Sequence, residues 1–362
     1  GCEAGVRLFL SEVARLTPQA LALMHPYAPD RNTAEGFCGY HASTLSGLDN
    51  VVLMKGAPGT GKSTLIKRVA KECAKRGLDC ELWYCSGDPE SLDGIFVKEL
   101  GAAVFDATSP HPVEATLPVI RERTVDMAAA LSREKLLPCA KEVEELVKNK
   151  KECYKRAYEH IKCAFGYYAK REEAYFACVD KGEILRRAAA FALRAGQGNR
   201  TLSCGAGEGR RAYSRALTPL GERGFSDHLI GKRVVLVKGC EAGVRLFLSE
   251  VARLTPRALV LMHPYAPDRI DAVVTGEWAV TGNACEFADA ADEIDLADIE
   301  RGCAGKCEFH ASRIREWLAL AVSDLAAAKA AHGEIELIHA AAMDYSVTDE
   351  IASSVEEMIF GK

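Results

Sequence analysis

The feature that most constrains this fold is a strand–helix–strand pattern that occurs twice in the chain. The apolar run VVLMKG at 51–56 returns as VVLVKG at 234–239, and an amphipathic segment and a second apolar run follow each copy. Short apolar runs rich in β-branched residues are typical of buried strands. Because strands that alternate with helices favour a parallel sheet, we predict an α/β protein with two doubly wound, related halves.

The glycine-rich stretch GQGNRTLSCGAGEG, residues 196–209, separates the two halves. Its composition is typical of a linker, which we place at 196–211. The first half then covers 32–195, and the second covers 212–362. Each half ends in a long segment with helical periodicity and few helix breakers, so we expect a helical hairpin attached to each sheet domain.

Residues 1–31 are a near-copy of residues 239–269. Only two positions differ, so 29 of 31 are identical. The later copy is preceded by the apolar run RVVLVK, whereas no such strand precedes the first copy. A helix and a strand without that neighbour bury their apolar faces poorly, so we interpret 1–31 as a non-functional partial duplicate. The alternative is that this segment packs on a sheet edge or exchanges with a neighbouring molecule.

The first strand and its helix are joined by GAPGTGKS at 56–63, which has the G-x-x-x-x-G-K-[ST] pattern of a phosphate loop. Glycines in such a loop let successive backbone N–H groups turn toward phosphate oxygens, and the N-terminus of the following helix faces the same anion. Lys62 would bring a positive charge to the β- and γ-phosphates, and Ser63 a hydroxyl ligand to Mg²⁺. The predicted nucleotide-binding residues are Gly56, Pro58, Gly59, Thr60, Gly61, Lys62, Ser63 and Thr64.

A metal-binding carboxylate is expected at the end of a neighbouring strand. Asp106 directly follows the apolar run AAVF, which is the Walker B position where an acid helps to hold Mg²⁺. The alternative is an aspartate that caps a turn. The sequence therefore predicts Ser63 and Asp106 as the metal ligands.

Further polar residues follow the strands of the first half. His111 would sense the γ-phosphate or orient a water molecule, or it is an ordinary loop residue. Asp88 and Asp93 follow the second apolar run, where either can position a water or accept a proton from an acceptor hydroxyl. Asp88-Pro89 is equally typical of the start of a helix. The predicted catalytic residues are Lys62, Asp106, Asp88 and His111.

The corresponding loop of the second half has lost the pattern. Aligned with 56–63, residues 239–246 carry Arg245 and Leu246 in place of the lysine and the serine. Because a leucine side chain cannot bind Mg²⁺, we predict a structural or regulatory second half that does not hydrolyse nucleotide. A further hypothesis is that Arg245 or Arg211 reaches the first site and stabilises charge there as an arginine finger.

With its two related halves and these motifs, the sequence resembles a bacterial family of tandem P-loop ATPases. The resemblance covers residues 32–362 and includes the stretch DATSPH at 106–111. The matching residues are Gly56, Gly61, Lys62, Ser63 and Asp106. The resemblance implies two P-loop NTPase-like parallel-sheet domains that bind and hydrolyse ATP. In that family the second half usually keeps its own GKS-type loop, a pattern from which this sequence departs.

Taken together, the motifs predict an ATP-binding P-loop NTPase with Mg²⁺-dependent hydrolysis in the first half. No NKxD-like guanine motif occurs in the chain, which favours ATP over GTP as the nucleotide. Two alternatives stay open, namely a small-molecule or nucleotide kinase and a non-catalytic nucleotide sensor or scaffold.

The composition narrows the range of partners. Hydrophobic residues make up 48% and charged residues 27% of the chain, as in folded proteins, and no apolar stretch is long enough to span a membrane. A net charge of −5 argues against a nucleic-acid partner. The scattered cysteines indicate reduced thiols and a cytoplasmic location. The expected partner is a nucleotide, and a protein partner is left open.

Overall fold

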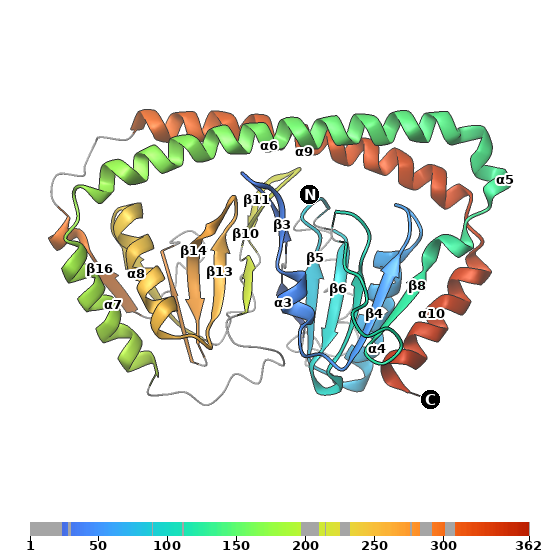
Figure 1. Ribbon diagram of the computed structural model, residues 1–362, viewed down its shortest axis with the longest axis horizontal. Coiled ribbons are helices and arrows are strands. Elements are labelled where there is room, and N and C mark those ends of the chain that lie inside the picture. Colours follow the sequence, from blue (N-terminus) through green and yellow to red (C-terminus); the bar gives the residue numbers. More distant parts are fainter. Residues whose placement is uncertain are drawn as a thin grey trace.

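The computed structural model describes residues 24–27, 30–88, 90–110, 112–196, 210–213, 215–224, 232–275, 277–282, 292–300 and 308–361. Within these ranges the protein has a mixed α/β architecture, in which two sheets stand side by side beneath a pair of long helices (Figure 1). The helices are α3 (His41–Leu45), α4 (Lys62–Arg76), α5 (Arg133–Leu136), α6 (Ala140–Phe176), α7 (Lys181–Gly196), α8 (Glu241–Leu254), α9 (Glu308–Ala341) and α10 (Tyr345–Phe360).

The two sheets repeat one strand order in the described part of the chain. The first sheet has the order β1-β5-β6-β7-β4-β8, and the second has the equivalent order β9-β13-β14-β15-β12-β16. The strands of the first sheet are β1 (Met24–Tyr27), β4 (Asn50–Lys55), β5 (Cys80–Tyr84), β6 (Leu92–Val97), β7 (Ala102–Asp106) and β8 (Glu122–Asp126). Those of the second are β9 (Arg211–Tyr213), β12 (Arg233–Lys238), β13 (Leu259–His263), β14 (Ala266–Val274), β15 (Trp278–Thr281) and β16 (Asp292–Asp295). The repeat in the sequence is therefore a repeat of the fold.

Short elements complete each half in the same positions. Antiparallel hairpins lie between the sheets and the long helices, and each has the same hydroxyl-to-carbonyl hydrogen bond of 2.8 Å, from Thr33 to Gly36 and from Thr218 to Gly221. The hairpin strands are β2 (Asp30–Thr33), β3 (Gly36–Gly39), β10 (Arg215–Thr218) and β11 (Gly221–Gly224). The 3₁₀ turns are η1 (Lys98–Leu100), η2 (Met127–Ala130), η3 (Leu137–Cys139) and η5 (Ala297–Ile299).

One central strand of each sheet runs antiparallel to its neighbours, so the prediction of wholly parallel sheets is wrong. β6 pairs antiparallel with β5 and β7, and β14 does so with β13 and β15. The connection from β6 to β7 consists of η1 and Gly101, and so short a connection joins antiparallel neighbours because parallel ones need a crossover. β4 stays parallel to β7 and β8, which keeps the carboxyl ends of β4 and β7 together.

Residues of each strand alternate between two apolar layers, as a pleated strand requires. On β4, Val52 packs in the core beneath α4, whereas Leu53 faces the second sheet. The inner faces of the sheets meet directly, because Phe105 of the first sheet shares a core with Leu261 of the second. The sheets are therefore not doubly wound as predicted, since the inner face of the first sheet meets the second sheet and only the short helix α3.

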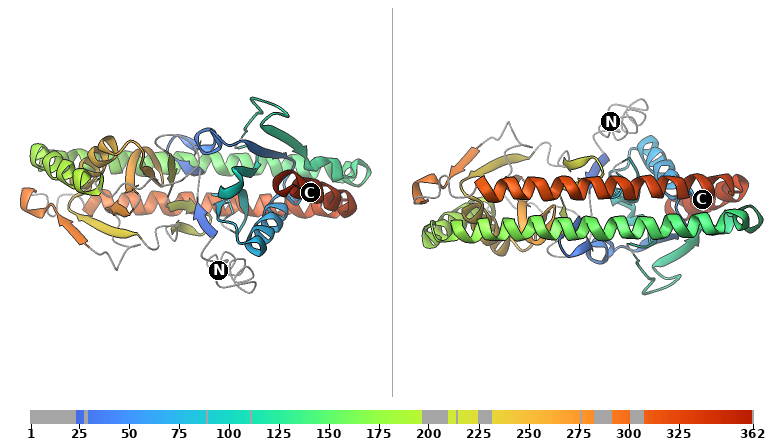
Figure 2. Two further views of the ribbon diagram at one scale, coloured as in Figure 1. Left: turned by 90° about the horizontal axis from the view of Figure 1, so that it is seen from below. Right: turned by 90° about the horizontal axis from the view of Figure 1, so that it is seen from above.

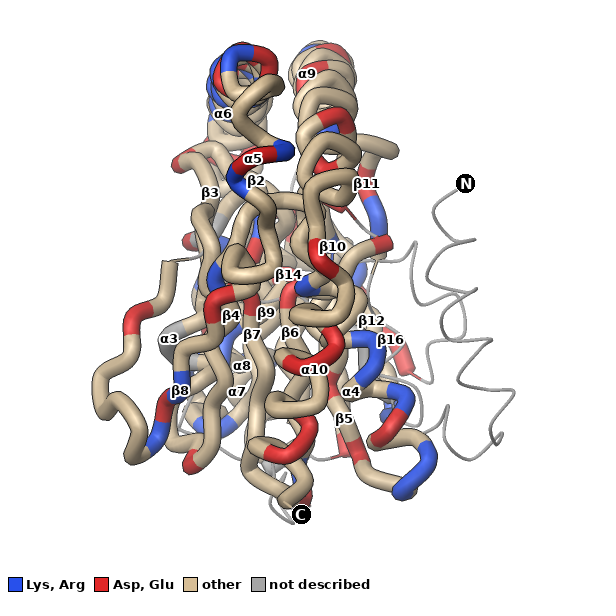
Figure 3. Tube along the Cα trace, turned by 90° about the vertical axis from the view of Figure 1, so that its right-hand side faces the viewer, with Lys and Arg blue, Asp and Glu red and all other residues tan. Residues whose placement is uncertain are grey.

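The two long helices carry the ends of the halves across to the opposite sheets. α6 and α9 lie side by side and antiparallel (Figure 2), with Arg156 and Asp324 paired at 2.9 Å, and they lie above the sheets when seen from the end (Figure 3). α6 has 37 residues, about 55 Å at 1.5 Å per residue. α7 then packs on the second sheet through Ile184, and α10 packs on the first through Ile359. The predicted attachment of each hairpin to its own sheet is therefore wrong.

Part of the near-copy at 1–31 belongs to the first sheet. β1 pairs in parallel with β5, from Met24 opposite Cys80 to Tyr27 opposite Trp83. It lies at the edge of the sheet, as the alternative interpretation of this segment expects. Residues 1–23 lie outside the described ranges.

The exchange of α7 and α10 leads to a stability test. Ile359 of α10 is buried in the core of the first sheet, so Ile359→Ala is expected to lower the free energy of unfolding by about 2–5 kcal/mol. Urea unfolding of the full chain measures the change. Ser354→Ala on the exposed face of the same helix is the control, and a loss for Ile359→Ala no larger than that of the control would contradict the packing of α10 on this sheet.

Candidate functional site

The loop that joins β4 to α4 has the backbone turns expected of a phosphate loop. Gly59 and Gly61 adopt φ angles of 80° and 84°, in the left-handed region that only glycine occupies without strain. α4 begins immediately afterward at Lys62, and the Leu65 N–H donates to the Gly61 carbonyl at 2.9 Å. The first turn of α4 therefore presents its free N–H groups toward the loop.

The ammonium of Lys62 lies over the loop. Its Nζ donates to the Gly56 carbonyl at 2.8 Å and to the Ala57 carbonyl at 2.9 Å, and its side chain is only 11% exposed. The same Nζ lies 3.7 Å from Oδ2 of Asp106. The structure thus brings together the lysine and the carboxylate that the sequence predicts as partners.

Asp106 reaches this position because β7 lies next to β4 and runs parallel to it. Met54 of β4 is opposite Asp106 in the register, so the carboxylate follows at the edge where the loop begins. Its Oδ1 accepts from the Thr108 N–H at 2.9 Å, and the Thr108 hydroxyl is 3.2 Å from the Gly56 carbonyl. One oxygen of Asp106 therefore caps a turn, as the alternative interpretation expects, while the other faces Lys62. The role of Asp106 as a metal ligand stays a prediction.

The hydroxyl residues of the loop have separate environments. The Ser63 Oγ accepts from the Leu92 N–H at 2.9 Å, which fixes the hydroxyl at the start of α4. Thr60 is buried and donates to the Ala57 carbonyl at 2.8 Å, so it stabilises the turn of the loop. Thr64 is exposed at the first turn of α4.

Three further residues were considered for catalysis, and the structure describes two of them. Asp88 pairs with Lys329 of α9 at 2.8 Å, and the same oxygen accepts from the Glu90 N–H at 3.1 Å. The ion pair therefore gives Asp88 a role in holding α9. Asp93 is buried on β6, and His111 lies outside the described residues.

Helix α9 lies directly against the outer side of the loop. A Cβ atom at Gly59 would stand 2.5 Å from the Glu336 carbonyl oxygen, and His339 Nδ1 donates to the Pro58 carbonyl at 2.8 Å. Sequence analysis missed these residues, and also Lys329 and His332 of α9 and Lys150 of α6. The residues of α9 do have a signal in the sequence, because positions 329, 332, 336 and 339 follow the 3- and 4-residue spacing of one helix face.

The second half lacks an equivalent loop. α8 is already helical from Glu241, with only two residues between it and the end of β12, so a helical turn replaces the loop. The buried residues Phe247, Leu248 and Val251 repeat the spacing of 65, 66 and 69 in α4, which places Arg245 opposite the serine of the first half. The predicted alignment of Arg245 with the lysine is therefore wrong by one position.

Internal ion pairs fill this part of the second half. The carboxylate of Glu172 on α6 is buried and pairs with Arg245 at 2.5 Å and with Arg269. Nearby Glu241 pairs with Arg171, and burial raises the pKa of Glu241 while Arg171 opposes that shift. Carboxylates of the protein itself therefore already pair with the arginines of this site.

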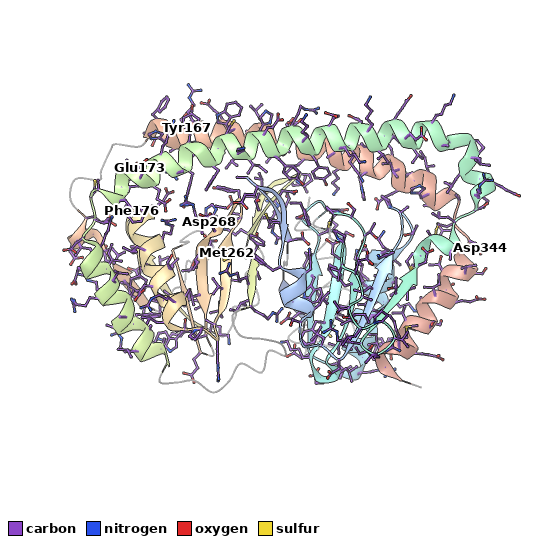
Figure 4. All side chains as sticks on the ribbon, in the orientation of Figure 1. Tyr167, Glu173, Phe176, Met262, Asp268 and Asp344 are labelled. Atoms are coloured by element: carbon purple, nitrogen blue, oxygen red, sulfur yellow. The ribbon has the colours of Figure 1, made fainter. Side chains whose placement is uncertain are left out.

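The hypothesis of Arg245 as an arginine finger does not agree with its position. Arg245 lies over the ring of Phe176, 5.3 Å from its centre, whereas Gly61 of the glycine-rich loop lies beside Thr348 of α10, near Asp344. Phe176 and Asp344 lie toward opposite ends of the molecule (Figure 4). Arg211 is on β9 in the second sheet.

Comparison with protein-family models, with curated proteins and with solved structures finds no match for this chain. None of the helices in the described ranges has the apolar length that crossing a membrane requires. Within the same ranges no group of three or more His, Cys, Asp or Glu side chains is placed to hold a metal ion. Mg²⁺ beside a nucleotide needs fewer protein ligands, because phosphate oxygens and water supply the rest.

The contact between α9 and the loop leads to a paired glycine test. Gly59→Ala and Gly77→Ala both place a side chain at positive φ, which costs about 1–2 kcal/mol, but a Cβ at Gly77 meets open space. Gly59→Ala must also displace the backbone of α9, so we expect it to destabilise the protein by about 1–3 kcal/mol more than Gly77→Ala. Urea unfolding measures both variants, and equal losses would show that α9 does not press on the loop.

Proposed function

We propose that this chain is an ATP-binding P-loop NTPase whose first half binds Mg-ATP and hydrolyses the β–γ bond. The observation that carries the proposal is the position of Lys62, whose Nζ binds two loop carbonyls and lies 3.7 Å from Oδ2 of Asp106. A glycine-rich turn with a structural role needs neither the lysine nor the carboxylate. The loop before α4 supports a P-loop NTPase-like fold for the first half, as the resemblance to tandem P-loop ATPases implies.

Each residue has a distinct task in this proposal. Backbone N–H groups of the loop and of the first turn of α4 bind phosphate oxygens. Lys62 brings its charge to the β- and γ-phosphates. Ser63 and Asp106 would hold Mg²⁺, which neutralises charge on those phosphates when it is bound. The residues fit this role, because Oδ2 of Asp106 is not the oxygen that Thr108 uses and Ser63 has its hydroxyl at the helix start.

The second half has a structural part in the proposal. Its own loop position is a helical turn, and Glu172 already neutralises Arg245 and Arg269 there. Its helix α9 contacts the phosphate loop of the first half at Pro58 and Gly59. The second half therefore acts on the first site by covering it.

The first functional prediction concerns the charge of Lys62. Lys62→Ala removes the cation that binds the β- and γ-phosphates, so we expect it to weaken Mg-ATP binding by about tenfold or more. Titration calorimetry on the full chain measures the affinity. Lys75→Ala, at an exposed position near the other end of α4, is the control and should bind like the unchanged protein. Equal affinities for Lys62→Ala and the control would refute the proposed site.

The second functional prediction concerns the carboxylate of Asp106. Asp106→Asn keeps the size of the side chain but removes the charge that would hold Mg²⁺, so phosphate release should fall by about a hundredfold. Binding of ATP in the absence of Mg²⁺ should persist, because Lys62 and the loop remain. Asp49→Asn at an exposed position serves as the control for removing an acid. Unchanged phosphate release by Asp106→Asn would rule out this aspartate as the metal ligand.

The same assays separate the proposal from its alternatives. Release of phosphate from ATP alone supports hydrolysis, whereas ADP formation that needs an added small molecule supports a kinase. Tight binding without phosphate release over hours supports a nucleotide sensor or scaffold.

A further inference from the structure

The polar face of α9 that covers the phosphate loop is held by specific contacts. Lys329 pairs with Asp88 at 2.8 Å, and His339 Nδ1 donates to the Pro58 carbonyl at 2.8 Å. Between them, the backbone of Glu336 packs against Gly59. These contacts fix the position of α9 above the loop, and His332, which lies one helical turn before Glu336, is fixed with it.

Lys150 of α6 extends into this region from the neighbouring helix. Its Nζ lies 3.3 Å from His332 Nδ1, which is its one side-chain hydrogen bond among the described residues. A lysine ammonium donates only, so Nδ1 accepts and Nε2 carries the hydrogen, which faces Glu336 Oε1 at 3.5 Å. The series Lys150–His332–Glu336 therefore orients the ammonium of Lys150.

Lys150 is partly buried among charges of both signs. Burial lowers the pKa of Lys150, and the nearby carboxylate of Glu336 opposes this shift. The charges of Lys151 and Lys62 lower the same pKa further. Lys62 and Lys150 come from α4 and α6, and both lie near the loop. An anion that binds near both lysines would stabilise the charge of each.

We propose that Lys150, held against α9 by His332, binds the terminal phosphate of the nucleotide. This inference rests on the proposed function, because it places Lys150 at the same nucleotide. Lys62 of a phosphate loop reaches the β- and γ-phosphates. Lys150 is held on the part of α9 that packs against the same loop, which places its ammonium to meet the γ-phosphate end. His332 and Glu336 are positioning residues that act through Lys150.

The chemistry of phosphoryl transfer gives this lysine a task. As the bond from the γ-phosphorus to the bridging oxygen breaks and water attacks, negative charge spreads over the γ-oxygens and the leaving β-phosphate. A cation fixed near those oxygens stabilises the charge. ADP has no γ-phosphate, so Lys150 would distinguish ATP from ADP.

The experiment compares ATP and ADP binding to Lys150→Gln, Lys150→Arg and the control Lys148→Gln. Lys148 lies exposed on the same helix. We expect Lys150→Gln to lose about tenfold or more in ATP affinity while its ADP affinity stays within about twofold. Lys150→Arg should recover most of the ATP affinity because it keeps the charge, and Lys148→Gln should resemble the unchanged protein.

Several outcomes would overturn the proposal. If Lys150→Gln changes neither affinity, or lowers the ATP and ADP affinities equally, then Lys150 does not contact the γ-phosphate. The Lys62→Ala variant separates a failure of this inference from a failure of the proposed function. If the proposed function is wrong, Lys62→Ala binds ATP like the unchanged protein. If only the inference about Lys150 is wrong, Lys62→Ala still binds ATP more weakly. Thermal unfolding of each variant identifies a loss that comes from misfolding, and the charge-preserving Lys150→Arg then decides whether the cation matters.

Discussion

The rest of the structure depends on the direct packing of one sheet on the other. α4 and α10 cover the outer face of the first sheet, whereas inner residues such as Leu53 and Phe105 pack against the second sheet and the short helix α3. Burial of apolar surface is the main favourable contribution to folding. The second half thus contributes to the core of the first sheet whether or not it binds a ligand. This shared core also fixes the distance over which α6 and α9 must run.

The two halves keep the same helices but use them in opposite ways. Glu336 of α9 and Glu172 of α6 each lie eight residues before the aspartate that precedes the next helix, Asp344 and Asp180. At Glu336 the backbone touches Gly59, and the loop keeps two lysines near it. At Glu172 the carboxylate itself pairs with the arginines. In the first half Lys62 lies beside both the loop carbonyls and Asp106, whereas in the second half a buried glutamate pairs directly with two arginines.

The sequence allowed prediction of features that depend on local order. The strand, the loop glycines and Lys62 follow one another in the chain, and Asp106 ends an apolar run, so their places could be expected. Contacts made across the fold could not be read in the same way. The antiparallel β6 depends on a short turn, and the cover provided by α9 depends on which sheet a long helix reaches. The spacing of polar residues in α9 indicated that they share one face of a helix, but it did not indicate which part of the protein that face contacts.

The near-copy at the start of the chain shows how neighbours decide the structure of a segment. The tetrapeptide MHPY is a strand throughout in β1, whereas in the later copy the strand β13 ends at His263 and a turn follows. β1 is an edge strand, but β13 is paired on both sides, with β9 and β14. Identical peptides thus adopt two different conformations within one molecule, and the difference follows the strands that neighbour each copy.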